Sequence, residues 1–206
     1  MASKIKCYAV AFTVLLLISP LFAENPKLSL HINGGLCWML KKNIDSGLKT
    51  GFGFSVPVVE KTTLTFDFGF WKSGVQEETG GLYDGTLTMA PFQASLYYTL
   101  FETRRFAPYV FGGTGIVFSH FKAEDIISIP EVSIDQKVNN GISLHAGAGS
   151  FLKINKRIAF YGEACFFYRK GEGSTTYTDM NFGKSTKNFS LDLSSLVFSI
   201  GIKYYL

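Results

Sequence analysis

The last seventeen residues of the chain, 190–206, alternate strictly between large apolar side chains and small or polar ones. The apolar parity is unbroken up to the final residue and comprises Leu196, Phe198, Ile200, Ile202, Tyr204 and Leu206. The other parity holds Ser195, Ser199, Gly201 and Lys203, with Val197 and Tyr205 as apolar exceptions. A side-chain period of two is that of a β-strand with one apolar face, so we expect the chain to end in such a strand.

Seven earlier segments alternate in the same way and are separated by turn or loop residues. They lie near 28–38, 49–58, 63–71, 84–101, 107–121, 142–153 and 158–169. After the first 23 residues, no segment has the apolar spacing of an amphipathic helix. With the last strand this makes about eight strands, an even number, which predicts an all-β, eight-stranded antiparallel up-and-down barrel.

The fifth segment, 107–121, does not show which of its faces is apolar. Large apolar residues occupy one parity at Tyr109, Phe111, Val117 and Phe121, and the other at Val110, Ile116 and Phe118. The glycines between them would permit a bulge that switches parity. The sequence therefore leaves the facing of this strand open.

The composition of the two faces indicates what surrounds the barrel. One face carries Phe, Leu, Ile and Trp almost continuously, whereas the other is mainly Gly, Ser and Thr with occasional charges. An eight-stranded barrel has room inside for side chains and little else. We therefore expect the apolar face to meet lipid, as a transmembrane β-barrel requires, rather than a ligand inside a soluble barrel. Aromatic residues expected in the girdles at the two membrane interfaces are Trp38, Tyr98, Tyr109, Tyr168 and Tyr204.

Residues 1–23 have the features of a cleaved secretory signal peptide. Lys4 and Lys6 precede an apolar run from Ala9 to Ile18, and Ala23 is the small residue before the expected cut. The rival interpretation, a membrane anchor, needs about 20 apolar residues and the run is shorter. The predicted mature domain is the barrel, 24–206.

The connections between the strands differ in length at the two ends. Short ones follow the second, fourth and sixth strands, at 59–61, 102–106 and 154–156. Long polar ones follow the third, fifth and seventh, at 73–83, 122–140 and 171–189. Short turns of outer-membrane barrels face the periplasm and long loops face outward. We therefore expect an extracellular ligand, if there is one, to contact the three long loops.

The chain as a whole resembles the small OmpA/OmpX-type outer-membrane β-barrels. The stretch Ala107-Pro108-Tyr109-Val110, followed by Gly112, Gly113 and Gly115, resembles their fifth strand, and Tyr161-Gly162-Glu163-Ala164 is also similar. Ser199, Gly201, Tyr204 and Leu206 resemble the C-terminal assembly signal of such barrels, with Leu206 in place of the usual Phe. The resemblance implies a multi-pass protein of the Gram-negative outer membrane, without a catalytic role. It also implies roles in envelope structure, adhesion or host contact, with membrane lipid, lipopolysaccharide and the barrel-assembly machinery as partners.

Seven polar residues are expected to form a network in the barrel lumen. They are Lys49, Asp67, Glu163, Arg169, His31, His145 and Gln93. Buried charges need partners, and mixed signs in a narrow lumen favour a charge-paired plug over the alternative, a small pore for ions or solutes. Lys49 and Asp67 lie on adjacent strands and are the expected pair.

Other chemistry finds little support in the sequence. An outer-membrane acyl hydrolase, the least favoured alternative, needs a serine beside its histidine, and only Ser143 shares a face with His145. Cys37 and Cys165 fall on the first and seventh strands with the last strand between them, too far apart for a disulfide, so we expect free thiols. The scattered histidines predict no metal site and no cofactor. The absence of a basic stripe argues against nucleic acid as a partner.

Overall fold

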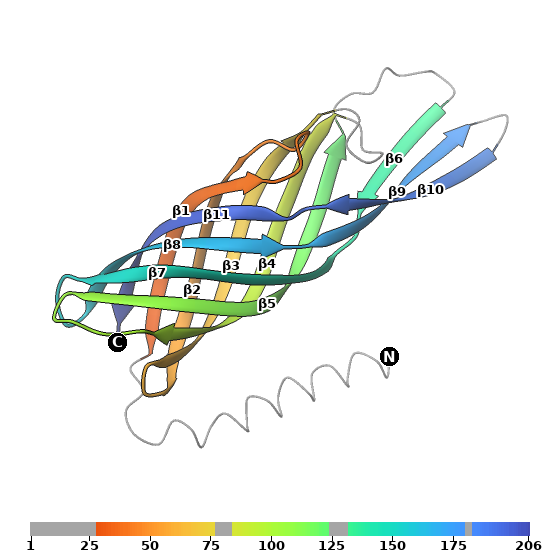
Figure 1. The fold of residues 1–206 in the computed structure, drawn as a ribbon. Helices are drawn as coiled ribbons and strands as arrows, with labels where there is room; N and C mark the ends of the chain where they lie inside the picture. The colour runs from red at the N-terminus through yellow and green to blue at the C-terminus, as the bar shows by residue number, and fades with distance from the viewer. Residues whose placement is uncertain (1–27, 77–83, 124–131, 180–182) are drawn as a thin grey trace, which may run out of the picture.

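The computed structural model describes residues 28–76, 84–123, 132–179 and 183–206, and these residues form eleven β-strands. Eight of the strands close into an antiparallel barrel in the order β1-β11-β8-β7-β5-β4-β3-β2, and three form a separate sheet in the order β10-β9-β6 (Figure 1). The barrel strands are β1 Ser29–Met39, β2 Gly47–Val59, β3 Thr62–Val75, β4 Gly85–Thr99, β5 Phe106–Ala123, β7 Gly141–Lys153, β8 Ile158–Tyr168 and β11 Ser195–Tyr205. The predicted fold class and strand number of the barrel are confirmed.

No helix in the described part of the chain is long and apolar enough to cross a membrane. The signal peptide predicted for residues 1–23 lies outside the described residues, and so does the segment 77–83 of the first long loop.

The predicted alternation of apolar and polar side chains is observed in the barrel wall, with the apolar side chains outside. On β11, Ile200 is 74% exposed on the outside, while Ser199 beside it is 3% exposed in the lumen. The same pattern holds around the barrel, where exposed outward side chains include Ile32, Phe52, Phe54, Phe92, Ile142, Phe160, Phe166 and Phe198. A continuous apolar exterior on a closed barrel is what a lipid environment requires, because closure pairs the backbone groups and leaves only side chains facing the lipid.

The fifth strand, β5, keeps one parity throughout. It pairs with β4 and with β7 in continuous register, without a bulge. Val110, Ile116 and Phe118 are exposed on the outside, and the opposite set, Tyr109, Phe111, Val117 and Phe121, is buried in the lumen. The placement of Tyr109 in an interfacial girdle was therefore wrong. Gly113 serves close packing rather than a bulge, since a Cβ there would collide with the carbonyl oxygen of Ala94 on β4.

One neighbouring pair of strands is interrupted. β3 and β4 are paired from Thr62 to Phe68 and again from Trp71 to Val75, but not at Gly69 and Phe70. The opposing segment of β4 contains Pro91, which has no N–H to donate to the ladder. The Pro91 ring is fully buried on the lumen side, and its Cγ lies 3.2 Å from where a Cβ of Gly69 would be.

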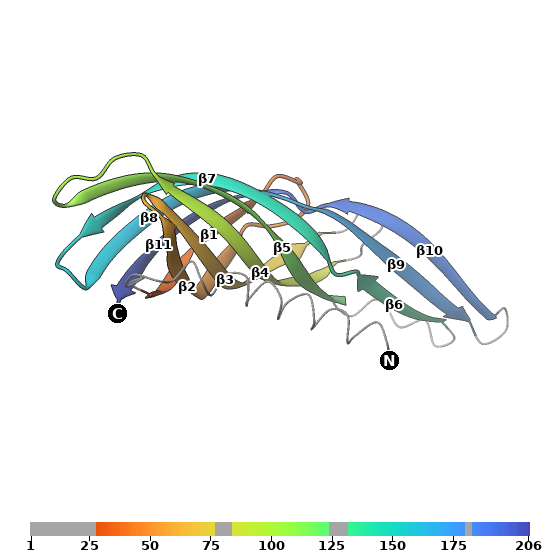
Figure 2. The same ribbon diagram turned by 90° about the horizontal axis from the view of Figure 1, so that it is seen from below.

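The long connections are more structured than predicted. Segments 122–140 and 171–189 were expected as loops, but they contain β6 Val132–Val138 and most of β9 Lys170–Asp179 and β10 Gly183–Asp192. β8 runs into β9 through Arg169, and β10 runs into β11 through Leu193 and Ser194. The pairs β8–β11 and β7–β8 of the barrel are thus continued by β9–β10 and β6–β9 beyond its rim (Figures 1 and 2). We call this three-stranded extension the rim sheet.

The two ends of the barrel differ as predicted. The short connections β2–β3, β4–β5 and β7–β8 lie at the end where the chain finishes, which we call the turn end, and the rim sheet lies at the opposite end (Figure 1). The turn end is periplasmic and the rim sheet extracellular according to the sequence-based prediction.

Candidate functional site

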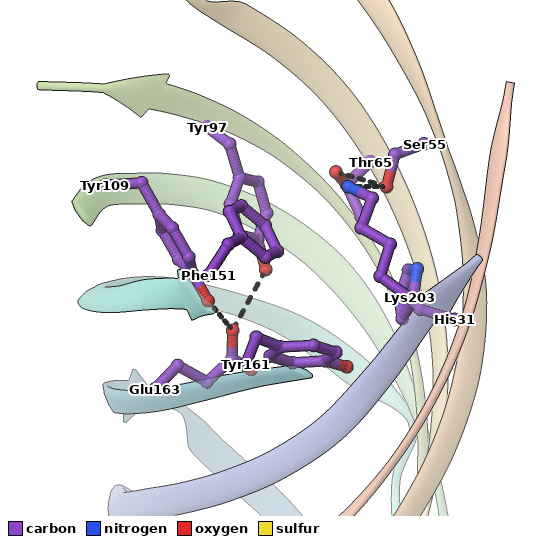
Figure 3. Close-up of a pocket in the computed structure, with 9 residues that line it drawn as sticks. All are labelled: His31, Ser55, Thr65, Tyr97, Tyr109, Phe151, Tyr161, Glu163 and Lys203. Carbon is purple, nitrogen blue, oxygen red and sulfur yellow. Dashed lines mark hydrogen bonds between the residues drawn. The ribbon is translucent and has the colours of Figure 1, made fainter. Parts of the chain in front are cut away.

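The turn-end half of the lumen is filled by polar and aromatic side chains. The cavity left between them has a volume of about 10 Å³ (Figure 3), which is room for about one water molecule. Its lining residues are His31, Ser55, Thr65, Tyr97, Tyr109, Phe151, Tyr161, Glu163 and Lys203. This layer of the lumen is a packed plug.

A short hydrogen bond in the plug joins His31 of β1 to Asp67 of β3. His31 Nε2 lies 2.6 Å from Asp67 Oδ1, and the His31 side chain is 5% exposed. The two residues are separated by β2, where Gly53 faces both of them in register. A Cβ on Gly53 would lie 2.7 Å from His31 Nε2, so the missing side chain is what lets the imidazole reach across β2.

The predicted pair of Lys49 and Asp67 was wrong. Lys49 is paired in register with Trp71 rather than with Asp67, and its Nζ donates to Ser199 Oγ at 3.5 Å. Asp67 takes His31 as its partner instead. The partner of Asp67 is therefore determined by the strand register and by the absence of a side chain at Gly53. Position on an adjacent strand is not sufficient.

Glu163 of β8 is held by hydroxyl groups. Tyr109 of β5 donates to Glu163 Oε2 at 3.2 Å and Tyr97 of β4 donates to the same oxygen at 3.4 Å (Figure 3). The two tyrosine rings lie 5.1 Å apart. Both donors come from across the lumen, so the plug at this point is satisfied by hydrogen bonds rather than by the predicted opposite charge. Tyr97 was not among the residues predicted for the network.

Lys203 of β11 belongs to the same layer, although it was predicted only to lie on the lumen face. Its Nζ donates to Ser55 Oγ at 3.0 Å and lies 4.9 Å from the centre of the Phe151 ring. Thr65 donates to the same Ser55 oxygen at 3.1 Å. The ammonium is thus stabilised by a hydroxyl and by the face of an aromatic ring.

His145 and Gln93 do form a cluster, with Ser95 as third member. Gln93 Nε2 lies 2.9 Å from His145 Nδ1, and His145 Nε2 lies 2.6 Å from Ser95 Oγ. Because the Gln93 amide donates to Nδ1, the imidazole carries its proton on Nε2 and donates it to Ser95. His145 therefore cannot take the proton of Ser95 in this arrangement.

The geometry does not favour an acyl hydrolase. Ser95 is 2% exposed and His145 6%, so neither is open to a substrate. Ser143, the serine that the sequence places on the same face as His145, donates to the carbonyl oxygen of Gly115 at 3.4 Å. A nucleophile needs an adjacent base and access, and neither serine combines the two.

The sheet-end half of the lumen is apolar, which was not predicted. The small polar lumen that we expected is replaced here by a buried cluster in which the Trp71 and Phe167 rings are nearly perpendicular, with ring centres 5.4 Å apart. Its other members include Cys37, Met39, Leu87, Met89, Val117, Phe121 and Val197. We call this cluster the apolar layer. It fills the sheet-end half of the lumen, as the polar plug fills the turn-end half.

Cys37 and Cys165 are free thiols, as predicted. Cys37 of β1 and Cys165 of β8 are both paired with Val197 of β11, so β11 lies between them as predicted.

Arg169 lies apart from the rest of the predicted network. It is fully buried at the junction of β8 and β9, beyond the barrel strand. Its Nη1 donates to Ser119 Oγ of β5 at 2.6 Å and its Nη2 donates to the carbonyl oxygen of Asn139 at 2.7 Å. Burial lowers the pKa of Arg169 to about 10, so the guanidinium is charged at neutral pH. The residue ties the base of the rim sheet to β5 and to the β6–β7 connection.

Removing the carboxylate of Asp67 should destabilise the barrel by about 1–3 kcal/mol, because the buried His31 loses its partner. We expect a lower urea midpoint for Asp67→Ala in reversible unfolding from lipid vesicles. Asp135→Ala is the matched control: Asp135 pairs with Lys137 at 3.3 Å, but both side chains are more than 60% exposed. The control should change the free energy of unfolding by less than about 0.5 kcal/mol. Equal effects of the two substitutions would contradict a buried pair.

Comparison with known proteins identifies the fold. No family model matches the chain, and no curated protein matches it. Among solved structures, the outer membrane protein OprG from Pseudomonas aeruginosa superposes with a TM-score of 0.66 at 18% identity, over 88% of this chain and 97% of OprG. A major outer membrane protein from Thermus thermophilus gives a TM-score of 0.59 at 13% identity, over 89% and 100% of the two chains. Neisserial surface protein A gives 0.56 at 10% identity, over 89% and 100%.

These similarities show a shared architecture. The chain has the fold of the small eight-stranded outer-membrane β-barrels, and its exterior carries the exposed apolar side chains that such a location requires.

Proposed function

We propose that this outer-membrane barrel is a closed, non-enzymatic scaffold that acts through its rim sheet, in adhesion or other contacts outside the cell. The observation that carries the proposal is that the lumen is filled at both levels while three adjacent barrel strands continue past the rim as a sheet. A rigid barrel with a sheet extending from its rim is better suited to binding a partner than to transporting solutes.

The filled lumen gives less support to a pore for ions or small solutes. The polar layer leaves a cavity of about 10 Å³, which is too small for a hydrated ion. The apolar layer beyond it offers a permeating ion no polar partners. We therefore expect no discrete openings in planar bilayers, and reproducible single-channel steps from the purified protein would contradict the closed barrel.

The edge of the rim sheet is suited to contact. Within the described residues, β10 pairs only with β9, so one row of its backbone groups has no strand partner. Most side chains of β10 are exposed, including Lys184 and Lys187. Lysines on an edge strand oppose uncontrolled self-pairing, while the backbone groups remain available to an extended segment of a partner.

Removal of the β9–β10 hairpin should abolish contact while sparing the barrel. Gly173 and Phe189 are paired in register, so residues 174–188 can be replaced by an Asn-Gly turn that keeps the lower rungs of the hairpin. Cells of a non-adherent Gram-negative host that express this variant should attach to epithelial monolayers, or to immobilised lipopolysaccharide, no better than cells with an empty vector. Cells expressing the unmodified chain should attach severalfold better.

The control places the same Asn-Gly dipeptide at the turn end, in place of Glu60-Lys61 between β2 and β3. Attachment of this variant should equal that of the unmodified chain. Both variants should still migrate differently on a gel before and after boiling, as a folded barrel does. Unchanged attachment after loss of the hairpin, or no attachment by the unmodified chain, would contradict the proposal.

A second candidate function is the lateral passage of small apolar molecules. It is favoured by the interrupted β3–β4 ladder at Pro91, which lies next to Met89 and Trp71 of the apolar layer. A molecule that enters the apolar layer from the rim could leave through the wall at this point without crossing the polar plug.

Restoring the missing N–H should close such a path. Pro91→Ala should reduce severalfold the entry of an apolar dye such as N-phenylnaphthylamine into expressing cells. Pro108→Ala is the control, because Pro108 of β5 is paired with Ser150 of β7 in an unbroken register. Dye entry that is independent of both prolines would remove this candidate.

A further inference from the structure

A basic cleft lies at the turn end of the barrel, between the β4–β5 and β7–β8 connections and the end of β11. It has a volume of about 760 Å³ and is open to the surroundings. Four cations line it, Arg104, Arg105, Lys153 and Lys156, together with Tyr205. The two connections are joined by a hydrogen bond from Lys153 N to the carbonyl oxygen of Arg105, at 2.7 Å, so the cations are held on a common frame.

Most of the positive charge in the cleft is uncompensated. Glu102 pairs with Lys153. Within the described residues, no carboxylate lies at ion-pair distance from Arg104, Arg105 or Lys156, and all three side chains are exposed. Three clustered cations without partners favour binding of an anion with more than one negative oxygen.

The cleft adjoins the apolar exterior of the barrel. The same two hairpins carry Phe101, Phe106, Leu152 and Ile154, which are 45–54% exposed. The rings of Phe101 and Phe106 lie 6.4 Å apart and form one apolar surface beside Arg104 and Arg105. An anion at this position would thus have hydrocarbon on one side and aqueous surroundings on the other.

We propose that this cleft binds the phosphate headgroup of an anionic glycerophospholipid from the adjacent membrane leaflet. The phosphate accepts hydrogen bonds from Arg104, Arg105 and Lys156, and the acyl chains lie along Phe101, Phe106 and Leu152. A basic pocket at the level of the headgroups is a recognised chemistry for such lipids. A headgroup with two phosphates, as in cardiolipin, engages more of the three free cations than one with a single phosphate.

The full chain, refolded in detergent, provides the test by native mass spectrometry with added lipid. We expect cardiolipin to bind more tightly than phosphatidylglycerol, and phosphatidylcholine to bind least. The triple variant Arg104→Ala, Arg105→Ala, Lys156→Ala should lose more than about tenfold in cardiolipin affinity, given the contribution of each basic residue near a lipid headgroup. The matched control Lys170→Ala, Lys184→Ala, Lys187→Ala removes the same charge from exposed residues of the rim sheet and should bind like the unmodified chain.

Inorganic phosphate in millimolar excess distinguishes a lipid site from a simple anion site. It should not displace cardiolipin if the acyl chains contribute, and complete displacement would overturn the lipid assignment. Equal loss of binding in the two triple variants would show a non-specific charge effect and would also overturn it. Folding of each variant is checked by its shift in gel mobility on boiling. These outcomes do not depend on the rim sheet, so they leave the proposed function to its own test.

Discussion

Replacing Trp71 with alanine should destabilise the barrel by about 3–5 kcal/mol, the cost of removing a large aromatic side chain from a packed interior. Trp71 is 1% exposed in the apolar layer, where it lies between the sheet end and the polar plug. Its loss would leave a cavity beside Phe167 and Met89 that the closed wall cannot collapse to fill.

The chain contains its own control for this substitution, since Trp38 is its only other tryptophan. Trp38 is 63% exposed on the outside of β1. Trp38→Ala should therefore cost no more than about 1 kcal/mol, because it removes little packed volume. Urea unfolding in lipid vesicles, followed by gel mobility before and after boiling, gives both values. Equal destabilisation by the two substitutions would contradict the apolar layer.

A charge on the outer face should be costly in proportion to its depth. Ile200 lies at the centre of β11 and is 74% exposed to the outside. Ile200→Arg should destabilise the inserted barrel by about 2–4 kcal/mol, because the guanidinium is placed near the middle of the hydrocarbon. The yield of folded protein in the membrane should fall accordingly.

The control is an arginine at the edge of the same apolar band. Leu30, at the turn end of β1, is 48% exposed on the outside, so its substitution also alters the outer surface. Leu30→Arg should cost about 1 kcal/mol or less, since the charge reaches the headgroup region. A cost at Ile200 no greater than at Leu30 would show that the outer face does not meet lipid.

The strands could be predicted from the sequence because lipid imposes a one-sided apolar pattern on them. β11 shows this pattern most clearly, and its partners β1 and β8 show it nearly as well. β5 was ambiguous because Phe121 and Val117 face the apolar layer while Phe118 and Ile116 face outward. Both sides of the wall are apolar at that level, so hydrophobicity no longer distinguishes them although the side chains still alternate.

The other features that were predicted wrongly or not at all have local physical causes. His31 reaches Asp67 because Gly53, which lies between them, has no side chain. The order of the strands alone does not indicate this. The hydroxyl donors to Glu163 come from across the lumen, so no pattern along one strand indicates them. The strands β6, β9 and β10 extend beyond the barrel, and β9 and β10 lack the apolar alternation of the barrel strands. The proposed assembly role of Ser199, Gly201, Tyr204 and Leu206 stays a prediction.

The assignment of the two faces is the central claim, and fluorescence quenching by brominated lipid tests it most directly. Trp38 and Trp71 lie at similar heights on opposite faces, because Trp71 pairs with Lys49 and Lys49 pairs with Gly35, three residues from Trp38. Trp71→Phe leaves Trp38 as the single tryptophan, and its emission should be strongly quenched by bromine atoms on the acyl chains. Trp38→Phe leaves Trp71, whose emission should be little changed. Stronger quenching of Trp71 than of Trp38, or equal quenching of both, would contradict a barrel with lipid outside and a packed lumen within.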